Sequence, residues 1–315
     1  MKPHLDSHLQ YLSNELETVN TCDLCGGKLF GKESVVNGWN LVRCINCDFV
    51  FTSPRYTEAY LQKLYSERYY ERDSGYLSMQ IAEPAEDEYH LAKSLMKICG
   101  SNKRERKLRS LDVGCGAGRI VKAFRDSGWE AVGIDLNLKA VIAGTNRGLD
   151  LRVISRDSRE LGKFDLITGF HILEHLQSPS AFLRQCADRL SENGYLFIEV
   201  PNYGCRNARK MGPNWPYLYP DGHLCQFTAE TLIRYLIQAS FEVTRIEKVH
   251  GRGPLEDYGS CPTRGLRKRS NLKNIVFEFR HVLYWSSKSR RFLRHLFWHT
   301  LGYGEFIRIL ARRTN

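Results

Sequence analysis

The sequence predicts an α/β fold with a doubly wound sheet, and three observations predict it. The apolar run Leu108–Val113 is typical of a buried strand and leads directly into a glycine-rich loop. A second apolar run, Glu130–Ile134, ends in Asp135, about 20 residues beyond that loop. Further along, Thr228–Ser240 carries apolar residues at helical spacing, and Phe241–Val249 follows as a strand. Strands and helices that alternate in this way predict a sheet covered by helices on both faces.

The glycine-rich loop predicts a cradle for a ligand. Gly114, Gly116 and Gly118 free the backbone to turn sharply into a helix that starts near Arg119. Without Cβ atoms the chain can approach a nucleoside closely, and the helix N-terminus offers unpaired N–H groups to polar atoms. Asp135 stands where an acidic side chain in a doubly wound sheet accepts hydrogen bonds from ribose hydroxyls. Together these features predict a nucleoside site.

The order of the motifs resembles one family. A dinucleotide site needs Gly-x-Gly-x-x-Gly, whereas this loop reads Gly-x-Gly-x-Gly after Asp112 and is similar to the first motif of class I S-adenosylmethionine (SAM) methyltransferases. Phe164–Ile167 looks like the fourth strand of that family, His171–Leu176 like the segment after it, and Gly194–Asn202 like the fifth strand. The resemblance covers about residues 20–250 and implies a seven-stranded, Rossmann-like methyltransferase sheet.

The resemblance also implies roles for particular residues. Asp112 would support the loop and approach the methionine amino group of SAM, while Gly114 and Gly116 would pass under the methionine and the ribose. Asp135 would hold the ribose hydroxyls. Asp157 would contact the adenine amino group or, alternatively, be a solvated turn residue. The expected cofactor-binding set is Asp112, Gly114, Cys115, Gly116, Gly118, Asp135, Leu136, Asp157 and Phe170.

Methyl transfer from SAM depends more on how the enzyme positions the two substrates than on catalytic side chains. SAM carries its own leaving group, so the enzyme must bring a nucleophile in line behind the methyl group and remove a proton from a hydroxyl or carbon acid. Histidines near the carboxyl edge of the sheet are therefore the base candidates. We expect His223 to be the base, with His171 as the alternative. Glu174 and His175 are expected to shape the floor of the cofactor pocket.

Four cysteines near the N-terminus have the spacing of a metal site. Cys22 and Cys25 form one Cys-x-x-Cys pair, Cys44 and Cys47 form another, and 18 residues separate the two pairs. Two hairpin tips at this spacing can present four thiolates to one Zn²⁺ ion, and such a closed tetrahedral site is structural. Two disulfides are the alternative, although a chain without an export signal is expected to keep its thiols reduced.

These features divide the chain into segments. Tyrosines are concentrated after the cysteine pairs, where Pro54-Arg55 and Tyr69-Tyr70 resemble a lid found in ribbon-bearing methyltransferases of glycan and natural-product clusters. Aromatic faces in a lid would favour the cationic sulfonium; the alternative is that the tyrosines pack the ribbon against the core. We predict a tail at 1–19, a zinc ribbon at 20–53, a helical connector or lid at 54–100, a SAM-binding core at 101–250, a basic helical insertion between the last two strands at 251–304, and the last strand at 305–315.

Positive charge is concentrated near the C-terminus. Residues 252–315 carry 14 Lys and Arg against 4 Asp and Glu, while the whole chain has a formal net charge of +11. Basic and aromatic residues at helical spacing, with Trp285 and Trp298 among them, suit the surface of an anionic membrane and would fit a lipid-linked glycan substrate. The alternative roles for this basic segment are a substrate lid, an oligomer contact and a nucleic-acid-binding surface.

Targeting signals are not evident in the sequence. No stretch approaches the roughly 20 apolar residues of a membrane span, and Met1–Asn20 does not have the pattern of a secretory signal. We therefore expect a cytoplasmic protein, with peripheral contact at the inner face of the membrane as a further expectation from the basic insertion.

The resemblance extends to bacterial enzymes that methylate sugars, glycans or secondary metabolites. It implies O-methylation of a small-molecule or glycan hydroxyl with SAM as the methyl donor. An RNA methyltransferase that uses the basic insertion, and a non-catalytic SAM-binding protein, are the alternatives. Enzymes that methylate base amino groups usually carry Asn/Asp-Pro-Pro-aromatic after the fourth strand, and Phe170–Leu173 stands there instead. This difference argues against methylation of nucleic-acid bases.

Overall fold

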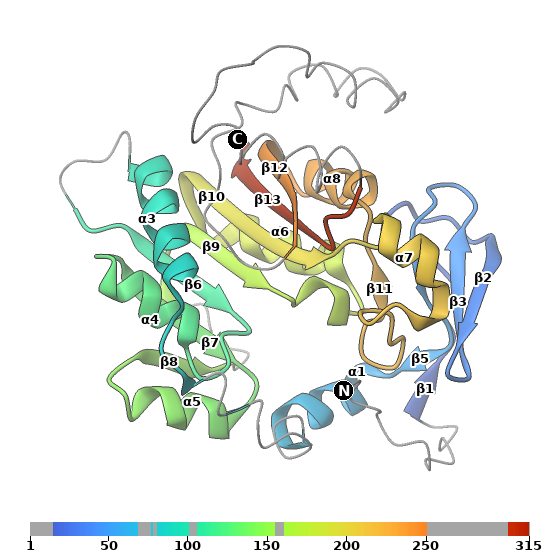
Figure 1. Cartoon of the computed structure of the whole chain (residues 1–315), viewed down its shortest axis with the longest axis horizontal. Helices are drawn as coiled ribbons and strands as arrows, with labels where there is room; N and C mark the ends of the chain where they lie inside the picture. Colours follow the sequence, from blue (N-terminus) through green and yellow to red (C-terminus); the bar gives the residue numbers. More distant parts are fainter. Residues whose placement is uncertain are drawn as a thin grey trace.

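A seven-stranded sheet lies at the centre of the molecule (Figure 1). The computed structural model describes residues 15–68, 77, 81–100, 106–154, 161–250 and 302–314. The strand order is β12-β13-β10-β9-β6-β7-β8. The strands from β10 to β8 pair in parallel, and β13 runs antiparallel between β10 and β12. The strands are β6 (Arg109–Val113), β7 (Glu130–Asp135), β8 (Asp150–Val153), β9 (Phe164–Phe170), β10 (Leu190–Pro201), β12 (Phe241–Val249) and β13 (Phe306–Arg313).

Helices cover both faces of this sheet, which confirms the doubly wound prediction. Neighbouring residues of one strand point to opposite faces, and on β9 Leu166 packs in one hydrophobic cluster while Ile167 packs in another. The cluster of Leu166 contains residues of α3 and α4, and the cluster of Ile167 contains residues of α6 and α8. The main helices are α3 (Glu86–Gly100), α4 (Arg119–Asp126), α5 (Leu138–Thr145), α6 (Pro179–Arg189), α7 (Arg206–Met211) and α8 (Ala229–Gln238).

The helix predicted over Thr228–Ser240 is α8, and it starts with a capping box. The Thr228 side chain accepts from the backbone N–H of Thr231, and the Thr231 hydroxyl accepts from the backbone N–H of Thr228. This reciprocal pair satisfies two N–H groups at the first turn of α8. Leu232 and Leu236, one turn apart, are fully buried against the sheet side of the helix.

The N-terminal region forms a small sheet that is joined to the core. Strands β2 (Phe30–Val36), β3 (Trp39–Cys44) and β4 (Val50–Thr52) form an antiparallel meander. A fourth strand, β11 (Cys225–Gln226), comes from the core and pairs with β4, with Cys225 opposite Phe51. The Thr52 hydroxyl also donates to the carbonyl of Pro220 (3.1 Å). The two parts of the chain therefore share one sheet.

The connector begins beside this sheet. Strand β5 (Arg55–Tyr56) pairs with β1 (Leu16–Glu17), and α1 (Glu58–Lys63) and a π-helical turn at Leu64–Arg68 follow. The Tyr56 ring is buried and stacks on Tyr60 with ring centroids 4.2 Å apart. Trp39 of β3 also packs against Tyr56, with its ring centroid 4.9 Å from that of Tyr56. The lid and packing interpretations of the tyrosines both stay predictions.

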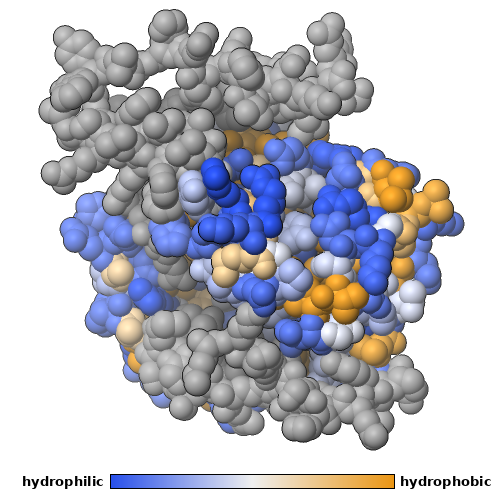
Figure 2. All heavy atoms as spheres, turned by 45° about the vertical axis from the view of Figure 1, so that its right-hand side comes forward, coloured by the Kyte–Doolittle hydropathy of each residue, from blue (hydrophilic) through white to orange (hydrophobic). Residues whose placement is uncertain are grey.

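The surface of the N-terminal sheet is mixed in polarity. It carries exposed apolar side chains, Leu29 and Ile45, which are 69% and 61% exposed. Figure 2 shows apolar patches interleaved with hydrophilic residues on the face that is turned forward. In the described part of the chain, no helix is both long and apolar enough to cross a membrane.

Some predictions concern positions outside the described residues. They are the N-terminal tail up to residue 14, the Tyr69-Tyr70 pair, Asp157, and the basic insertion over 251–301. The lid, membrane, oligomer and nucleic-acid roles of that insertion therefore stay predictions, as does the adenine contact of Asp157.

Candidate active site

A cavity of about 1890 Å³ opens at the carboxyl ends of the central strands. One wall is built by the ends of β6, β7 and β9 with the loops that follow them, and the opposite wall comes from the ribbon sheet, α1 and the turn after it. In open α/β sheets, ligands bind at this edge. The residues expected from the sequence that line the cavity are Cys22, Asp112, Gly114, Cys115, Asp135, Leu136, Phe170, His171, His175 and His223.

The glycine loop turns as its sequence predicts. Gly114 has φ +70, and a Cβ at this position would lie 1.9 Å from Cδ1 of Ile172. Gly118 has φ +81 and caps the N-terminus of α4 without a side-chain hydrogen bond. Since other residues rarely adopt positive φ, glycine is needed for the tight passage from β6 into α4. Gly116 and Gly118, which were expected in the cofactor-binding set, are not among the residues that line the cavity.

Two aspartates are fixed beside this loop. Asp135 accepts from the backbone N–H of Gly116 through Oδ2 and from that of Asn137 through Oδ1, both at 2.8 Å. Burial raises the pKa of Asp135, and the backbone hydrogen bonds work against that increase. Asp112 is buried and accepts from the Thr168 hydroxyl at 2.6 Å. The glycine loop thus lets the backbone approach a bound nucleoside closely. The two carboxylates can accept hydrogen bonds from its hydroxyl groups and from a cationic amino group.

His171 lies between two buried carboxylates. Its Nδ1 is 3.2 Å from Oε1 of Glu174, and its Nε2 is 3.1 Å from Oε1 of Glu199. Burial disfavours the charged imidazolium, but the two carboxylates outweigh burial and raise the pKa of His171 to about 9. Glu199 also pairs with Arg308 of β13. With both ring nitrogens donating to carboxylates, His171 has no free nitrogen to accept a proton.

A second pair of histidines is held differently. His223 is 3% exposed, and its Nδ1 lies 2.8 Å from the carbonyl of Tyr217. His175 Nδ1 lies 2.9 Å from the carbonyl of Gly222 and 2.9 Å from the Tyr65 hydroxyl. Because a carbonyl only accepts, Nδ1 is the protonated nitrogen of each ring, and the neutral ring keeps an unprotonated Nε2. Burial lowers the pKa of both histidines, so both are neutral.

The connector is tied to the cofactor side of the cavity by Asn137. Its side-chain Nδ2 donates to the carbonyls of Tyr65 (3.1 Å) and Ser66 (3.0 Å), and its Oδ1 caps α5 by accepting from the N–H of Ala140. Burial raises the pKa of the Tyr65 hydroxyl, as do the carboxylates of Glu174 and Asp221, so this hydroxyl stays protonated. Asn137 therefore holds the backbone of Tyr65 beside the loop after β7, and the Tyr65 hydroxyl reaches His175.

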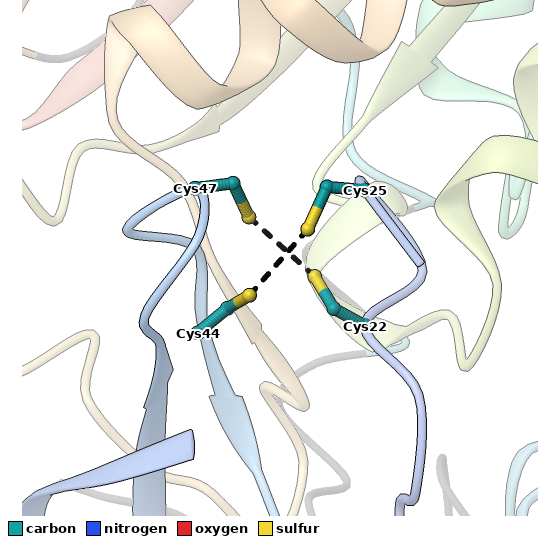
Figure 3. Close-up of side chains that lie close together, drawn as sticks. All are labelled: Cys22, Cys25, Cys44 and Cys47. Atoms are coloured by element: carbon teal, nitrogen blue, oxygen red, sulfur yellow. Dashed lines mark hydrogen bonds between the residues drawn. The ribbon is translucent and has the colours of Figure 1, made fainter. Parts of the chain in front are cut away.

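The four predicted metal ligands converge at the tip of the ribbon (Figure 3). The Sγ atoms of Cys22 and Cys47 are 3.5 Å apart, as are those of Cys25 and Cys44. Bonded sulfurs lie about 2.05 Å apart, so all four are free thiols and the disulfide alternative is wrong. Four sulfurs at about 2.3 Å from one Zn²⁺ ion lie roughly 3.8 Å from one another, which the cluster matches closely. The donor set is compatible with a structural zinc ion.

The sequence interpretation missed three residues that organise the site. Glu199 contacts His171, and Arg308 pairs with Glu199. A single charged residue inside an apolar stretch of each strand was the signal that could have singled them out. Asn137 follows Asp135 by two residues, and its buried side chain, 1% exposed, gave no such signal in the sequence.

The chain matches known proteins in its central part. Residues 85–246, more than half of the 315-residue chain, match a family model described as "Methyltransferase domain". The ubiquinone biosynthesis O-methyltransferase of Marinobacter nauticus is 30% identical over 105 residues, which are 30% of this chain and 44% of that protein. The protein of the same name from Xanthomonas oryzae pv. oryzae is 35% identical over 103 residues, 30% of this chain and 43% of that protein. The chain thus spans less than half the length of these relatives.

A solved structure shares the fold. The plantazolicin methyltransferase BpumL, in complex with a triazolic desmethylPZN analog and SAH, aligns with a TM-score of 0.51 at 14% identity. The alignment covers 82% of this chain and 95% of that one.

Proposed function

The chain belongs to the SAM-dependent methyltransferases, and on that basis we propose that it methylates a hydroxyl group of a small molecule or glycan. The observation that carries this proposal is that the glycine loop, Asp135, His175 and His223 all line one cavity. The glycine loop and Asp135 suit the binding of the cofactor, and the two histidines suit the deprotonation of an acceptor. The relatives named as O-methyltransferases support the choice of oxygen.

SAM would occupy the side next to the glycine loop. Asp135 would accept from the ribose hydroxyls with the lone pairs that its two backbone donors leave free. Asp112 would approach the methionine amino group, and Cys115, Leu136 and Phe170 would complete the walls. Binding there would point the sulfonium methyl group toward the rest of the cavity.

The acceptor oxygen would attack the methyl carbon in line with the departing sulfur. A C–O bond forms, the C–S bond breaks, S-adenosylhomocysteine leaves, and the proton of the hydroxyl passes to the protein. His223 offers an unprotonated Nε2 in the cavity, which makes it the better proton acceptor of the two histidines predicted from sequence. His171, with both nitrogens bound to carboxylates, would position the loop after β9 and not act as a base.

The cysteine cluster would hold a structural zinc ion. Cys22 itself lines the cavity, so the ribbon supplies part of the wall that faces the acceptor. Four thiolates fill the coordination sphere of Zn²⁺. The ion would therefore shape the acceptor side of the cavity without taking part in the reaction.

A methyl-transfer assay tests the proposal. The full chain is incubated with SAM labelled with tritium in the methyl group and with a cell extract separated into lipid, soluble-metabolite and RNA pools. We expect label in the lipid or metabolite pool, stable to mild base as an ether is. Label confined to RNA would replace the proposal with the RNA alternative, and no transfer to any pool would favour a non-catalytic SAM-binding protein.

A further inference from the structure

The acceptor side of the cavity holds a second group of metal-ligating side chains, distinct from the four cysteines. Glu174, His175 and His223 each offer one ligand atom, and these atoms all lie within 4.8 Å of one another. Two imidazoles and one carboxylate form a donor set that catalytic zinc and related first-row metals use. We propose that Glu174, His175 and His223 bind a divalent transition-metal ion at the acceptor side of the cavity.

The spacing of the ligand atoms fits one ion after a small movement. The Nε2 atom of His223 and the Oε1 atom of Glu174 are 3.9 Å apart. Ligands at about 2.0–2.2 Å from a tetrahedral metal ion lie roughly 3.4 Å from each other. A slight approach of the two side chains therefore brings both atoms to bonding distance. His175 and His223 face each other closely, with ring centroids 4.7 Å apart.

Glu174 has an oxygen that the protein leaves unused. The side chain is 1% exposed; Oε1 contacts His171, and Oε2 has no hydrogen-bond partner among the described residues. A buried carboxylate oxygen without a partner is costly. A cation held by both oxygens of this carboxylate would supply the interaction that Oε2 lacks.

Both histidines have the outer contacts that metal ligands usually have. A histidine that binds a metal through one nitrogen almost always donates the other N–H to a carboxylate, a backbone carbonyl or water. His223 makes such a contact with the carbonyl of Tyr217, and His175 with that of Gly222. The ring of Tyr219 packs on His223 at a centroid distance of 3.7 Å and fixes its orientation. The rings are thus already oriented with one nitrogen unprotonated.

Three protein ligands leave a coordination position open, as in catalytic metal sites. The ion would polarise a hydroxyl bound at that position and so favour its deprotonation. This part of the inference rests on the proposed function, and it changes the role of His223 from direct base to metal ligand. The metal site itself depends only on the three side chains.

Cobalt provides a direct test because it reports its ligands in its absorption spectrum. Co²⁺ is titrated into the full-length protein whose ribbon retains its zinc, and total metal per chain is measured in parallel. We expect one equivalent of bound Co²⁺ with visible d–d bands and without the near-ultraviolet thiolate charge-transfer band, in addition to the ribbon zinc. No acceptor is needed, so a failure here is separate from a failure of the methyl-transfer assay.

Substitution of the proposed ligands tests whether these side chains bind the ion. His223→Gln and Glu174→Gln should each weaken Co²⁺ binding by more than about 100-fold, the upper end of the loss for an outer-shell partner. His90→Gln is the matched control, because His90 is an exposed residue of α3 and 54% of its side chain is accessible. Retained ribbon zinc and an unchanged circular dichroism spectrum show that each variant is folded.

Two outcomes would overturn the proposal. One is the absence of any cobalt bands other than those of thiolate ligands, with a single metal ion per chain. The other is unchanged cobalt affinity in whichever of the two variants folds.

Discussion

Glu199 on β10 and Arg308 on β13 stand opposite each other in the register of the sheet and form an ion pair at 2.5 Å. Their side chains are 2% and 1% exposed, and each lies in an apolar stretch of its strand, 196–200 on β10 and 306–311 on β13. Glu199 also contacts His171, which lines the cavity, so the ion pair is connected to the candidate site. The central sheet and the candidate site thus share one buried charge network.

Removal of the arginine should be strongly destabilising. Arg308→Met leaves the Glu199 carboxylate in the core without its guanidinium, and we expect the free energy of unfolding to fall by about 3–5 kcal/mol. Urea unfolding followed by circular dichroism measures it. The control is Arg312→Met on the same strand, whose pair with Glu242 is partly exposed and is worth less than about 1 kcal/mol. Equal losses of unfolding free energy in the two variants would contradict the conclusion that burial makes the Glu199–Arg308 pair more important than the Glu242–Arg312 pair.

Asp135 should determine the affinity for SAM. Asp135→Asn removes the charge while keeping the shape, and a hydrogen bond to a charged group contributes about 1.5–3 kcal/mol. We expect the dissociation constant for SAM in titration calorimetry to rise about 10- to 100-fold. Asp150→Asn, an exposed aspartate at the start of β8, should bind SAM normally. Normal affinity in the Asp135 variant would remove the ribose assignment.

Gly114 should tolerate no side chain. In Gly114→Ala the new Cβ meets Ile172, and the alanine must also adopt φ +70. Gly148→Ala isolates the second effect, because Gly148 has φ +75 and nothing within 4 Å of a new Cβ. The control should lose about 1–2 kcal/mol of stability from backbone strain alone. Gly114→Ala should lose more and should also bind SAM more weakly, since Ile172 is pushed into the cavity; equal behaviour of the two variants would refute the collision.

Loss of the cysteine site should affect the core as well as the ribbon. Cys47→Ala breaks the set of four ligands, and the ribbon shares a sheet with β11 of the core. We expect loss of bound zinc, a lower midpoint of thermal unfolding and a marked rise in KM for the acceptor. Cys99→Ala, a buried cysteine of α3 outside the cluster, should keep its zinc. An unaltered midpoint in the Cys47 variant would show that the ribbon folds independently of metal.

The sequence predicted the elements whose signals are local. Glycine positions, apolar runs and the Cys-x-x-Cys pairs each depend on a few neighbouring residues, and the structure places the glycine loop, the strands and the cysteine cluster accordingly. A charge inside an apolar stretch can mark Glu199 and Arg308 as unusual, but their pairing with each other and the contact of Glu199 with His171 could not be found in this way. These residues are distant in sequence and meet only in the folded sheet. The same limit applied to β11, whose two residues gain their role only by pairing with β4.

The pairing of β4 with the distant strand β11 affects the folding of the chain during its synthesis. The ribosome produces β4 long before β11; Thr52 and its partner Pro220, which lie beside the two strands, are 168 residues apart. Until the later segment emerges, the edge of β4 presents unpaired backbone groups of the kind that attract other chains. The nascent N-terminal sheet therefore has an exposed edge while the core from β6 to β10 is made, and this edge is covered only after residues 225–226 have left the ribosome.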